Sequence, residues 1–274
     1  MRKLTTSMAL VATGAVLAGP IAAPAAAKKK TTITLSGSTS VAPLSALLIQ
    51  KYIKSGPGKG KVTFRQAQGG SDVGIADVAR GRVNIGNSSR DAKTSDPKGL
   101  TFNKIAKDAL CLVVNKQNSS ANFTQAQVQS IFSGKVRDWA DVPGSGRTGT
   151  INLVVRTAAS GTQDAFQKIF LGSATVSSAA AAKASSGLVA TAVEQDPNAI
   201  GYVSLEFASK LKAVGYNGVA CNLQNAKTGE YGGTRNLWMV TRGKATGEVK
   251  KFITWIQNSP DASKIISTEW VPLS

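Results

Sequence analysis

The sequence predicts an α/β fold with a mostly parallel sheet, because short apolar strands alternate with amphipathic helices along most of the chain. Several predicted strands end in turns rich in Ser, Thr and Gly, and a helix begins directly after most of these turns. In open α/β sheets, ligands bind beyond the carboxyl ends of the strands. The sequence therefore predicts a binding site built from these turns.

The first third of the chain contains three strand-to-turn units. The strands are expected at 32–35, 61–65 and 82–85, and the turns at 36–40, 69–72 and 86–90. Pro43 is placed in the first turn of a helix, where its missing N–H costs nothing. The apolar face of that helix consists of Leu44, Leu47, Leu48 and Tyr52.

The rest of the chain continues the alternation. Thr124 is a typical N-cap for a helix that buries Val128, Ile131 and Phe132. Further strands are expected at 109–114, 151–155, 199–203 and 236–241. Further helices are expected after 162, over the Ala/Ser-rich stretch 176–195, around 249–256 and just before Trp270.

The turn at 156–162 has the composition of an anion site. Arg156 follows the strand at 151–155 and brings a planar fork that matches two oxygens of an oxyanion. Gly161 allows close approach to the backbone, while Ser160 and Thr162 add hydroxyl donors. The helix that follows contributes free N–H groups and the positive end of its dipole.

Four such turns, the three above and 160–162, are expected to converge on one cleft between two lobes. Each turn alone is explained by the general preference for Ser, Thr and Gly at caps and turns. All four together, with Arg156 beside the last, favour a binding site.

Residues 1–27 are expected to be a signal peptide. Arg2 and Lys3 precede an apolar run that closes on Ala25-Ala26-Ala27, the small-residue pattern of a cleavage site. No Cys lies near that point, so we expect export without a lipid anchor, to a periplasmic, extracellular or wall-associated location.

Cys111 and Cys221 are the only cysteines. In an oxidising compartment such a pair can form one disulfide, but Cys111 lies in an apolar run where a buried free thiol is also ordinary. Spacing alone leaves both alternatives open.

The formal net charge of +18 favours anionic partners. Nucleic acid is not expected, because the basic residues are dispersed and no array of basic and aromatic residues appears. Anionic cell-envelope polymers are a second expected partner, held through salt-sensitive contacts. The chain has no His, which excludes Ser-His-Asp and Cys-His catalysis. We therefore expect no enzyme, no metal site and no cofactor.

Six motifs fall in order along the chain: GSTSVAP at 37–43, GGSDVGI at 69–75, NIGNSSR at 84–90, IFSG at 131–134 with Trp139, RTAASGT at 156–162 and AIGYV at 199–203. This series resembles the phosphate-binding proteins of bacterial phosphate ABC transporters, within the type II periplasmic-binding-protein-like superfamily. The resemblance implies a two-lobed Venus flytrap with a mixed, mostly parallel sheet in each lobe. It also implies a discontinuous first lobe at 31–115 and 207–274, and a second lobe at 116–206.

The resemblance also assigns phosphate ligands. From the first lobe they are Ser38, Thr39, Ser40, Ser71 and Ser89, and from the second Arg156, Ser160, Gly161 and Thr162. Ser89 stands where one branch of the family has an Asp that accepts the proton of hydrogen phosphate. Asp72 is a candidate replacement acceptor, although a carboxylate in the first turn of a helix has an ordinary role there.

The expected function is capture of inorganic phosphate by a monomer and its delivery to a membrane-embedded ABC permease. Three alternatives remain at this point. The first is a receptor of the same fold for sulfate, molybdate or tungstate. The second is a secreted enzyme acting on phosphate esters, and the third is a wall-associated adhesin or scaffold.

Overall fold

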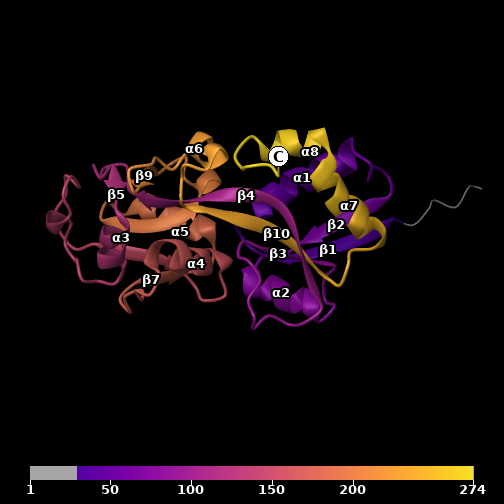
Figure 1. Cartoon of the computed structure of the whole chain (residues 1–274), viewed down its shortest axis with the longest axis horizontal. Coiled ribbons are helices and arrows are strands. Elements are labelled where there is room, and N and C mark those ends of the chain that lie inside the picture. Colours follow the sequence, from indigo (N-terminus) through magenta and orange to yellow (C-terminus); the bar gives the residue numbers. More distant parts are fainter. Residues whose placement is uncertain (1–29, 274) are drawn as a thin grey trace, which may run out of the picture.

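A computed structural model describes residues 30–273, which form two lobes joined by two long strands (Figure 1). These strands, β4 (Leu100–Val114) and β10 (Thr234–Arg242), cross the middle of the molecule. The expected signal peptide at 1–27 lies outside the described residues. None of the helices within 30–273 has the length and apolar character needed to cross a bilayer.

The first lobe contains a five-stranded sheet in the order β2-β1-β3-β10-β4. Strands β1 (Thr31–Gly37), β2 (Val62–Gln66) and β3 (Ile85–Ser88) are parallel, and β10 runs antiparallel between β3 and β4. Helices α1 (Ala42–Lys54), α7 (Gly247–Asn258) and α8 (Pro260–Ile266) cover one face, and α2 (Ser71–Ala79) covers the other.

The second lobe is built on the last residues of β4, which pair antiparallel with both β8 (Ala199–Ser204) and β9 (Lys212–Tyr216). Parallel strands extend this sheet on both sides: β6 (Asn152–Arg156), β7 (Ala181–Lys183) and β5 (Asn122–Phe123). The helical segments are α3 (Gln125–Phe132), η1 (Trp139–Asp141), α4 (Gly161–Phe166), the π-helical turn η2 (Gln167–Leu171), α5 (Ser186–Gln195), η3 (Leu205–Phe207) and α6 (Leu223–Thr228).

The predicted fold class is confirmed. Among the described strands, only β10 in the first lobe and β4 in the second run against the direction of their neighbours. Each sheet is therefore mixed but mostly parallel, and the carboxyl ends of its parallel strands face the cleft between the lobes.

The hydrophobic cores place the lobe boundaries elsewhere than expected. The core of the second lobe includes 109–114 and continues from Ala208 to Tyr231, whereas that of the first lobe resumes at Leu237. Strand β9 pairs with β4 and β5, so the core residues between Ala208 and Tyr231 pack mainly with the second lobe. We propose crossovers near 109 and 233 in place of 115 and 206.

The predicted helix positions are confirmed where the sequence contains a capping residue or a clear helical spacing of apolar residues. Thr124 caps α3 through a reciprocal capping box with Gln127, as the sequence indicated. The predicted helix at 176–195 is wrong in its first half, because 181–183 form β7 and α5 begins only at Ser186. Leu47, placed on the apolar face of α1, is 43% exposed.

Cys111 and Cys221 form a disulfide with a Cα–Cα distance of 5.6 Å. Cys111 lies in β4, and Cys221 lies in the segment that leads to α6. The bond therefore fixes that segment, and α6 behind it, to the central strand of the second lobe.

Reducing this disulfide is expected to lower the free energy of unfolding by about 2–4 kcal/mol, because the bond joins residues 110 positions apart and so restricts the unfolded chain. Urea unfolding with and without reductant measures the change. A Cys111→Ala/Cys221→Ala variant is the control and should not respond to reductant. An equal response in both proteins would contradict the prediction.

Candidate functional site

The residues predicted to bind an anion come together between the lobes, and all of them are buried. Three turns of the first lobe contribute Ser38, Thr39, Ser40, Ser71 and Ser89, and the second lobe contributes Arg156, Ser160, Gly161 and Thr162. The four turns converge as predicted, and we call this set of residues the anion shell.

Helix N-termini surround the anion shell. Helix α2 begins at Ser71, and α4 begins at Gly161, where the N-cap Ser160 accepts hydrogen bonds from the Thr162 and Gln163 N–H groups at 3.1 and 3.4 Å. Helix α5 begins at Ser186, and its N-terminus also lies at the anion shell. The positive ends of these helices and their first N–H groups favour negative charge.

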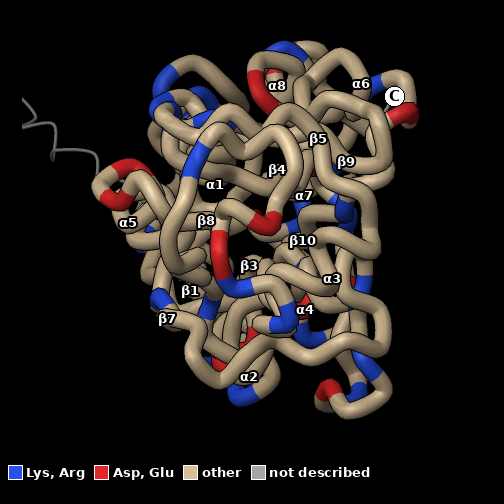
Figure 2. The backbone as a smooth tube through the Cα atoms, turned by 90° about the vertical axis from the view of Figure 1, so that its left-hand side faces the viewer, with Lys and Arg blue, Asp and Glu red and all other residues tan. Residues whose placement is uncertain are grey.

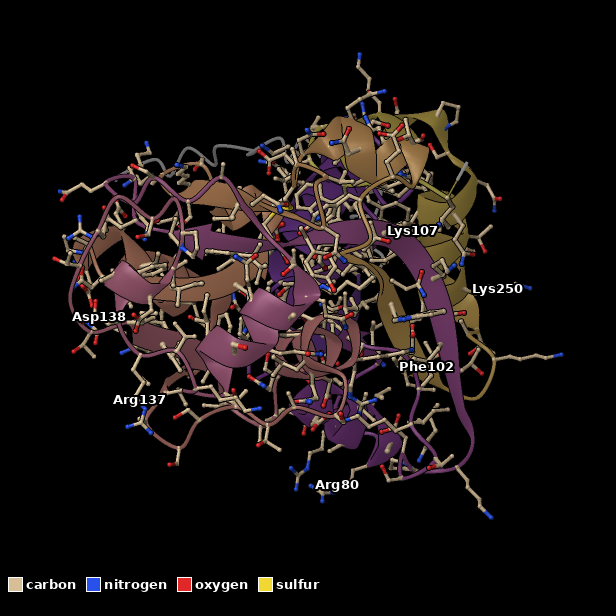
Figure 3. All side chains as sticks on the ribbon, turned by 60° about the vertical axis from the view of Figure 1, so that its left-hand side comes forward. Arg80, Phe102, Lys107, Arg137, Asp138 and Lys250 are labelled. Carbon is tan, nitrogen blue, oxygen red and sulfur yellow. A yellow bond between two sulfur atoms is a disulfide. The ribbon has the colours of Figure 1, made fainter. Side chains whose placement is uncertain are left out.

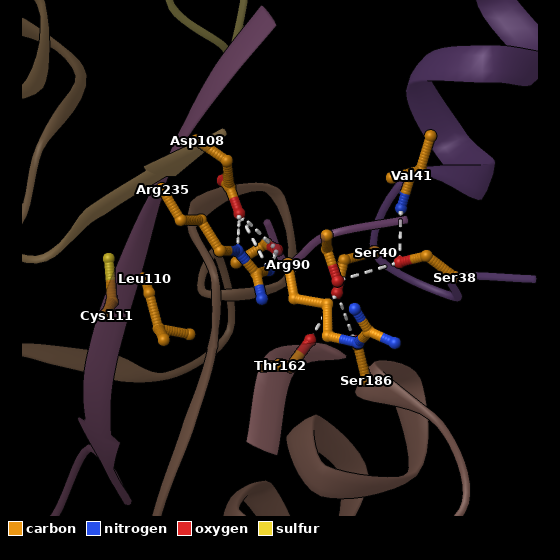
Figure 4. A network of polar contacts seen from close by, with 12 residues as sticks. Ser38, Ser40, Val41, Arg90, Asp108, Leu110, Cys111, Thr162, Ser186 and Arg235 are labelled. Atoms are coloured by element: carbon orange, nitrogen blue, oxygen red, sulfur yellow. Dashed lines mark hydrogen bonds and ion pairs between the residues drawn. The ribbon is translucent and has the colours of Figure 1, made fainter. Parts of the chain in front are cut away.

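The hydroxyl groups of the two lobes contact one another across the cleft (Figure 4). Ser40 Oγ lies 2.9 Å from Thr162 Oγ1 and 3.0 Å from Ser186 Oγ. Within the first lobe, the Ser38 hydroxyl donates to Ser89 Oγ at 3.0 Å. A hydroxyl both donates and accepts, so this shell can offer O–H groups to an oxyanion and can also accept a proton from it.

Arg156 is the cation of the anion shell, and it is only 3% exposed. Its guanidinium donates from Nη1 to Ser186 Oγ at 2.9 Å and from Nη2 and Nε to backbone carbonyls at 3.0 and 3.2 Å. None of the ion pairs formed by residues 30–273 includes it. Burial lowers the pKa of Arg156 to about 10, so it stays charged at neutral pH.

Tyr202 holds the backbone of Arg156 in place. Its hydroxyl accepts from the Arg156 N–H at 2.9 Å and donates to the Gln163 side chain. Burial raises the pKa of Tyr202, so the phenol stays neutral. The ring also stacks on Phe166, with centroids 3.8 Å apart, which ties the end of β6 to α4.

Ser186 is a shell residue that the sequence reasoning missed. Its hydroxyl contacts Arg156 and Ser40, and its N–H donates to Thr39 Oγ1 at 3.3 Å. The misplaced helix at 176–195 hid it, since the true N-cap is Ser185. The available signal was the Ser-Ser-Gly sequence at 185–187, which marks a helix start better than the Ala-rich residues before it.

Asp72 does not serve as an acceptor in the anion shell. Its carboxylate pairs with Arg90, which donates from Nε at 2.8 Å, and Asp96 holds the other side of the same guanidinium. Burial acts to lower the pKa of Arg90, but the Asp96 and Asp72 carboxylates beside it outweigh burial and raise this pKa above its ordinary value. The shell residues therefore include no carboxylate.

The lobes are closed on one another at this site. A Cβ added at Gly161 would lie 2.3 Å from Ser71 Oγ and 3.1 Å from the backbone N of Arg90. Asp164 of α4 pairs with Arg90 at 3.2 Å and with Lys93 at 2.6 Å, which joins the lobes at the rim. Residues 30–273 contain no cluster of His, Cys, Asp or Glu able to hold a metal ion. The arrangement suits enclosure of an anion.

The sequence profile of the PBP superfamily domain matches residues 22–260. The chain belongs to this superfamily.

Relatives of this PBP-superfamily chain include a "Phosphate-binding protein PstS" of Bacillus subtilis (strain 168), which is 29% identical over 90% of the chain and 82% of the relative. The PstS of Borreliella burgdorferi is 27% identical over 83% of the chain and 85% of the relative. Two solved structures resemble the fold. A putative phosphate ABC transporter substrate-binding protein from Clostridium perfringens, with bound phosphate, gives a TM-score of 0.82 at 28% identity, covering 89% of this chain and all of that one. An ABC-type phosphate transport receptor from Vibrio cholerae gives a TM-score of 0.69 at 27% sequence identity, covering 87% of this chain and 99% of that one.

Gly161→Ala is expected to keep the lobes apart while leaving each lobe folded, because the added methyl group would collide with Ser71 across the cleft. Small-angle X-ray scattering in phosphate buffer should show a larger radius of gyration than in the parent protein. Gly187→Ala is the matched control, since its Cβ would meet nothing closer than 4.0 Å. Equal radii for both variants would contradict the closed contact.

Proposed function

We propose that this protein captures inorganic phosphate in the cleft between its lobes and delivers it to a membrane-embedded ABC permease. The observation that carries the proposal is Arg156, a buried guanidinium whose partners are all neutral. Relatives named as phosphate-binding proteins, over most of the chain's length, support the choice of ion.

A buried charge without a counter-ion is unfavourable, and a bound anion removes that cost. The hydroxyls around Arg156 replace the water that a phosphate loses on entry. Each hydrogen bond to a charged group contributes about 1.5–3 kcal/mol, so a few of them are enough for micromolar binding after desolvation. Closure of the two lobes brings donors from both sides to the same ion.

The cellular setting follows from the same proposal. Export, a monomeric state and salt-sensitive retention by anionic envelope polymers fit a receptor that works outside the cytoplasm. Lys and Arg residues are spread over the backbone in Figure 2 and not gathered in one stripe, which fits loose attachment to a polymer better than a defined nucleic-acid interface. We propose no catalytic activity, since Ser160 acts as a helix cap and has no base beside it among the described residues.

Arg156→Ala is expected to weaken phosphate binding by about 2–5 kcal/mol, as for loss of a buried charged partner. Isothermal titration calorimetry measures the affinity directly. Arg137→Ala is the matched control, because Arg137 is exposed on the outer side of the second lobe (Figure 3). Unchanged affinity in Arg156→Ala would overturn the proposed function.

Ser89→Asp is expected to reduce sulfate binding much more than phosphate binding. Hydrogen phosphate can donate its proton to the new carboxylate, whereas fully ionised sulfate meets only like-charge repulsion. Competition titrations of the two ions at several pH values test this. If the parent protein already binds sulfate and rejects phosphate, the ion assigned here is wrong and the sulfate alternative replaces it.

A further inference from the structure

A cavity of about 510 Å³ lies in the cleft beside the anion shell. One wall is the loop at 89–93 of the first lobe, and the other is formed by residues of α4 and η2. Its floor consists of Lys107 on β4 and residues 234–236 on β10. We call this cavity the vestibule. Ser89 belongs to both the vestibule and the anion shell, so the two spaces adjoin.

The vestibule is rich in positive charge. Its basic residues are Arg90, Lys93, Lys107, Lys168 and Arg235, and its acidic residues are Asp91 and Asp164. Asp164 is held by Arg90 and Lys93, and Asp91 lies 3.6 Å from Lys168. Lys107 and Arg235 are therefore not paired with either of the two acidic residues that line the vestibule.

Arg235 lines the vestibule, but its charge is already paired with Asp108. Its Nε and Nη2 contact Asp108 Oδ2 at 2.9 and 2.8 Å, and its side chain is 4% exposed. Nη1 is buried and has no hydrogen-bond partner among residues 30–273. Because Nη1 has almost no accessible surface, a ligand in the open cavity cannot contact it, and the accessible charge on this side of the vestibule is that of Lys107. Lys107 beside it is exposed and enters none of the ion pairs of the described residues.

We propose that the vestibule binds the phosphoryl group of an anion larger than orthophosphate, either a condensed phosphate or a phosphate monoester. Lys107 and Lys168 would contact its oxygens. The cavity is too large for a tight fit around one small tetrahedral ion, and Ala92, Ala165 and Ile169 supply apolar wall for the remainder of an ester. Such a ligand would occupy the cleft together with the ion in the anion shell.

The test is calorimetric titration of tripolyphosphate and of phenyl phosphate into protein already saturated with orthophosphate. Both probes carry the required phosphoryl group, and comparing them tells a condensed phosphate from an ester. The test variant is Lys107→Gln/Lys168→Gln. The matched control is Lys250→Gln/Lys264→Gln, two exposed lysines of the helical face, of which Lys250 points away from the cleft in Figure 3.

One-to-one binding of at least one probe is expected, with affinity reduced about tenfold in the cleft variant, corresponding to two weakened contacts to charge. The control variant should stay within about twofold of the parent protein, since general charge has only a weak, screened effect. Absence of binding by both probes overturns the proposal. Equal weakening in the two double variants also overturns it, because the contact would then be non-specific attraction to a basic protein.

Discussion

The buried guanidinium of Arg156 is the constraint around which the rest of the structure is arranged. It lies in a place with almost no access to water, and its hydrogen bonds go to two backbone carbonyls and one hydroxyl. Arg235 provides the contrast, since that buried guanidinium has Asp108 as a counter-ion. A buried arginine that already has a carboxylate beside it needs no further anion, whereas Arg156 has none and fits the proposed position of a bound anion.

The topology explains why such a site requires two lobes. Parallel strands β1 and β3 end at the turns that supply Ser38, Ser40 and Ser89, and β6 of the other sheet ends at Arg156. Strand β4 passes through both sheets. It has the same direction as β1 and β3 in the first sheet, with the antiparallel β10 between them, and the opposite direction to β8 and β6 in the second, so the carboxyl ends of the two parallel sets face one another. Neither lobe alone brings together all the donors of the anion shell, so the proposed phosphate capture requires both lobes to meet.

The sequence was sufficient for the fold class and for most of the site, because these depend on local signals. Ser, Thr and Gly after an apolar strand mark both a turn and a helix cap, and the same residues are the donors of the anion shell. Ser186 and the lobe boundaries depended on long-range contacts. The low-complexity stretch before α5 has high helix propensity, yet 181–183 pair with β6 as a strand. The second crossover is set by the pairing of β9 with β4, a contact over about a hundred residues that no short pattern reports.

Charge acts at two ranges in this protein. The excess of lysine and arginine is spread over both lobes, exposed and screened by salt, so its effect is to raise the local concentration of anions. Within the cleft the charges have defined positions: Arg156 lies in the anion shell, and Arg235 and Lys107 lie on the floor of the vestibule beside it. The Asp164 contacts with Arg90 and Lys93 neutralise the rim only when the lobes meet. In the closed arrangement the charges at the rim are therefore paired with one another, whereas Arg156 and Lys107 enter none of the ion pairs of residues 30–273 and keep their charge available to an anion.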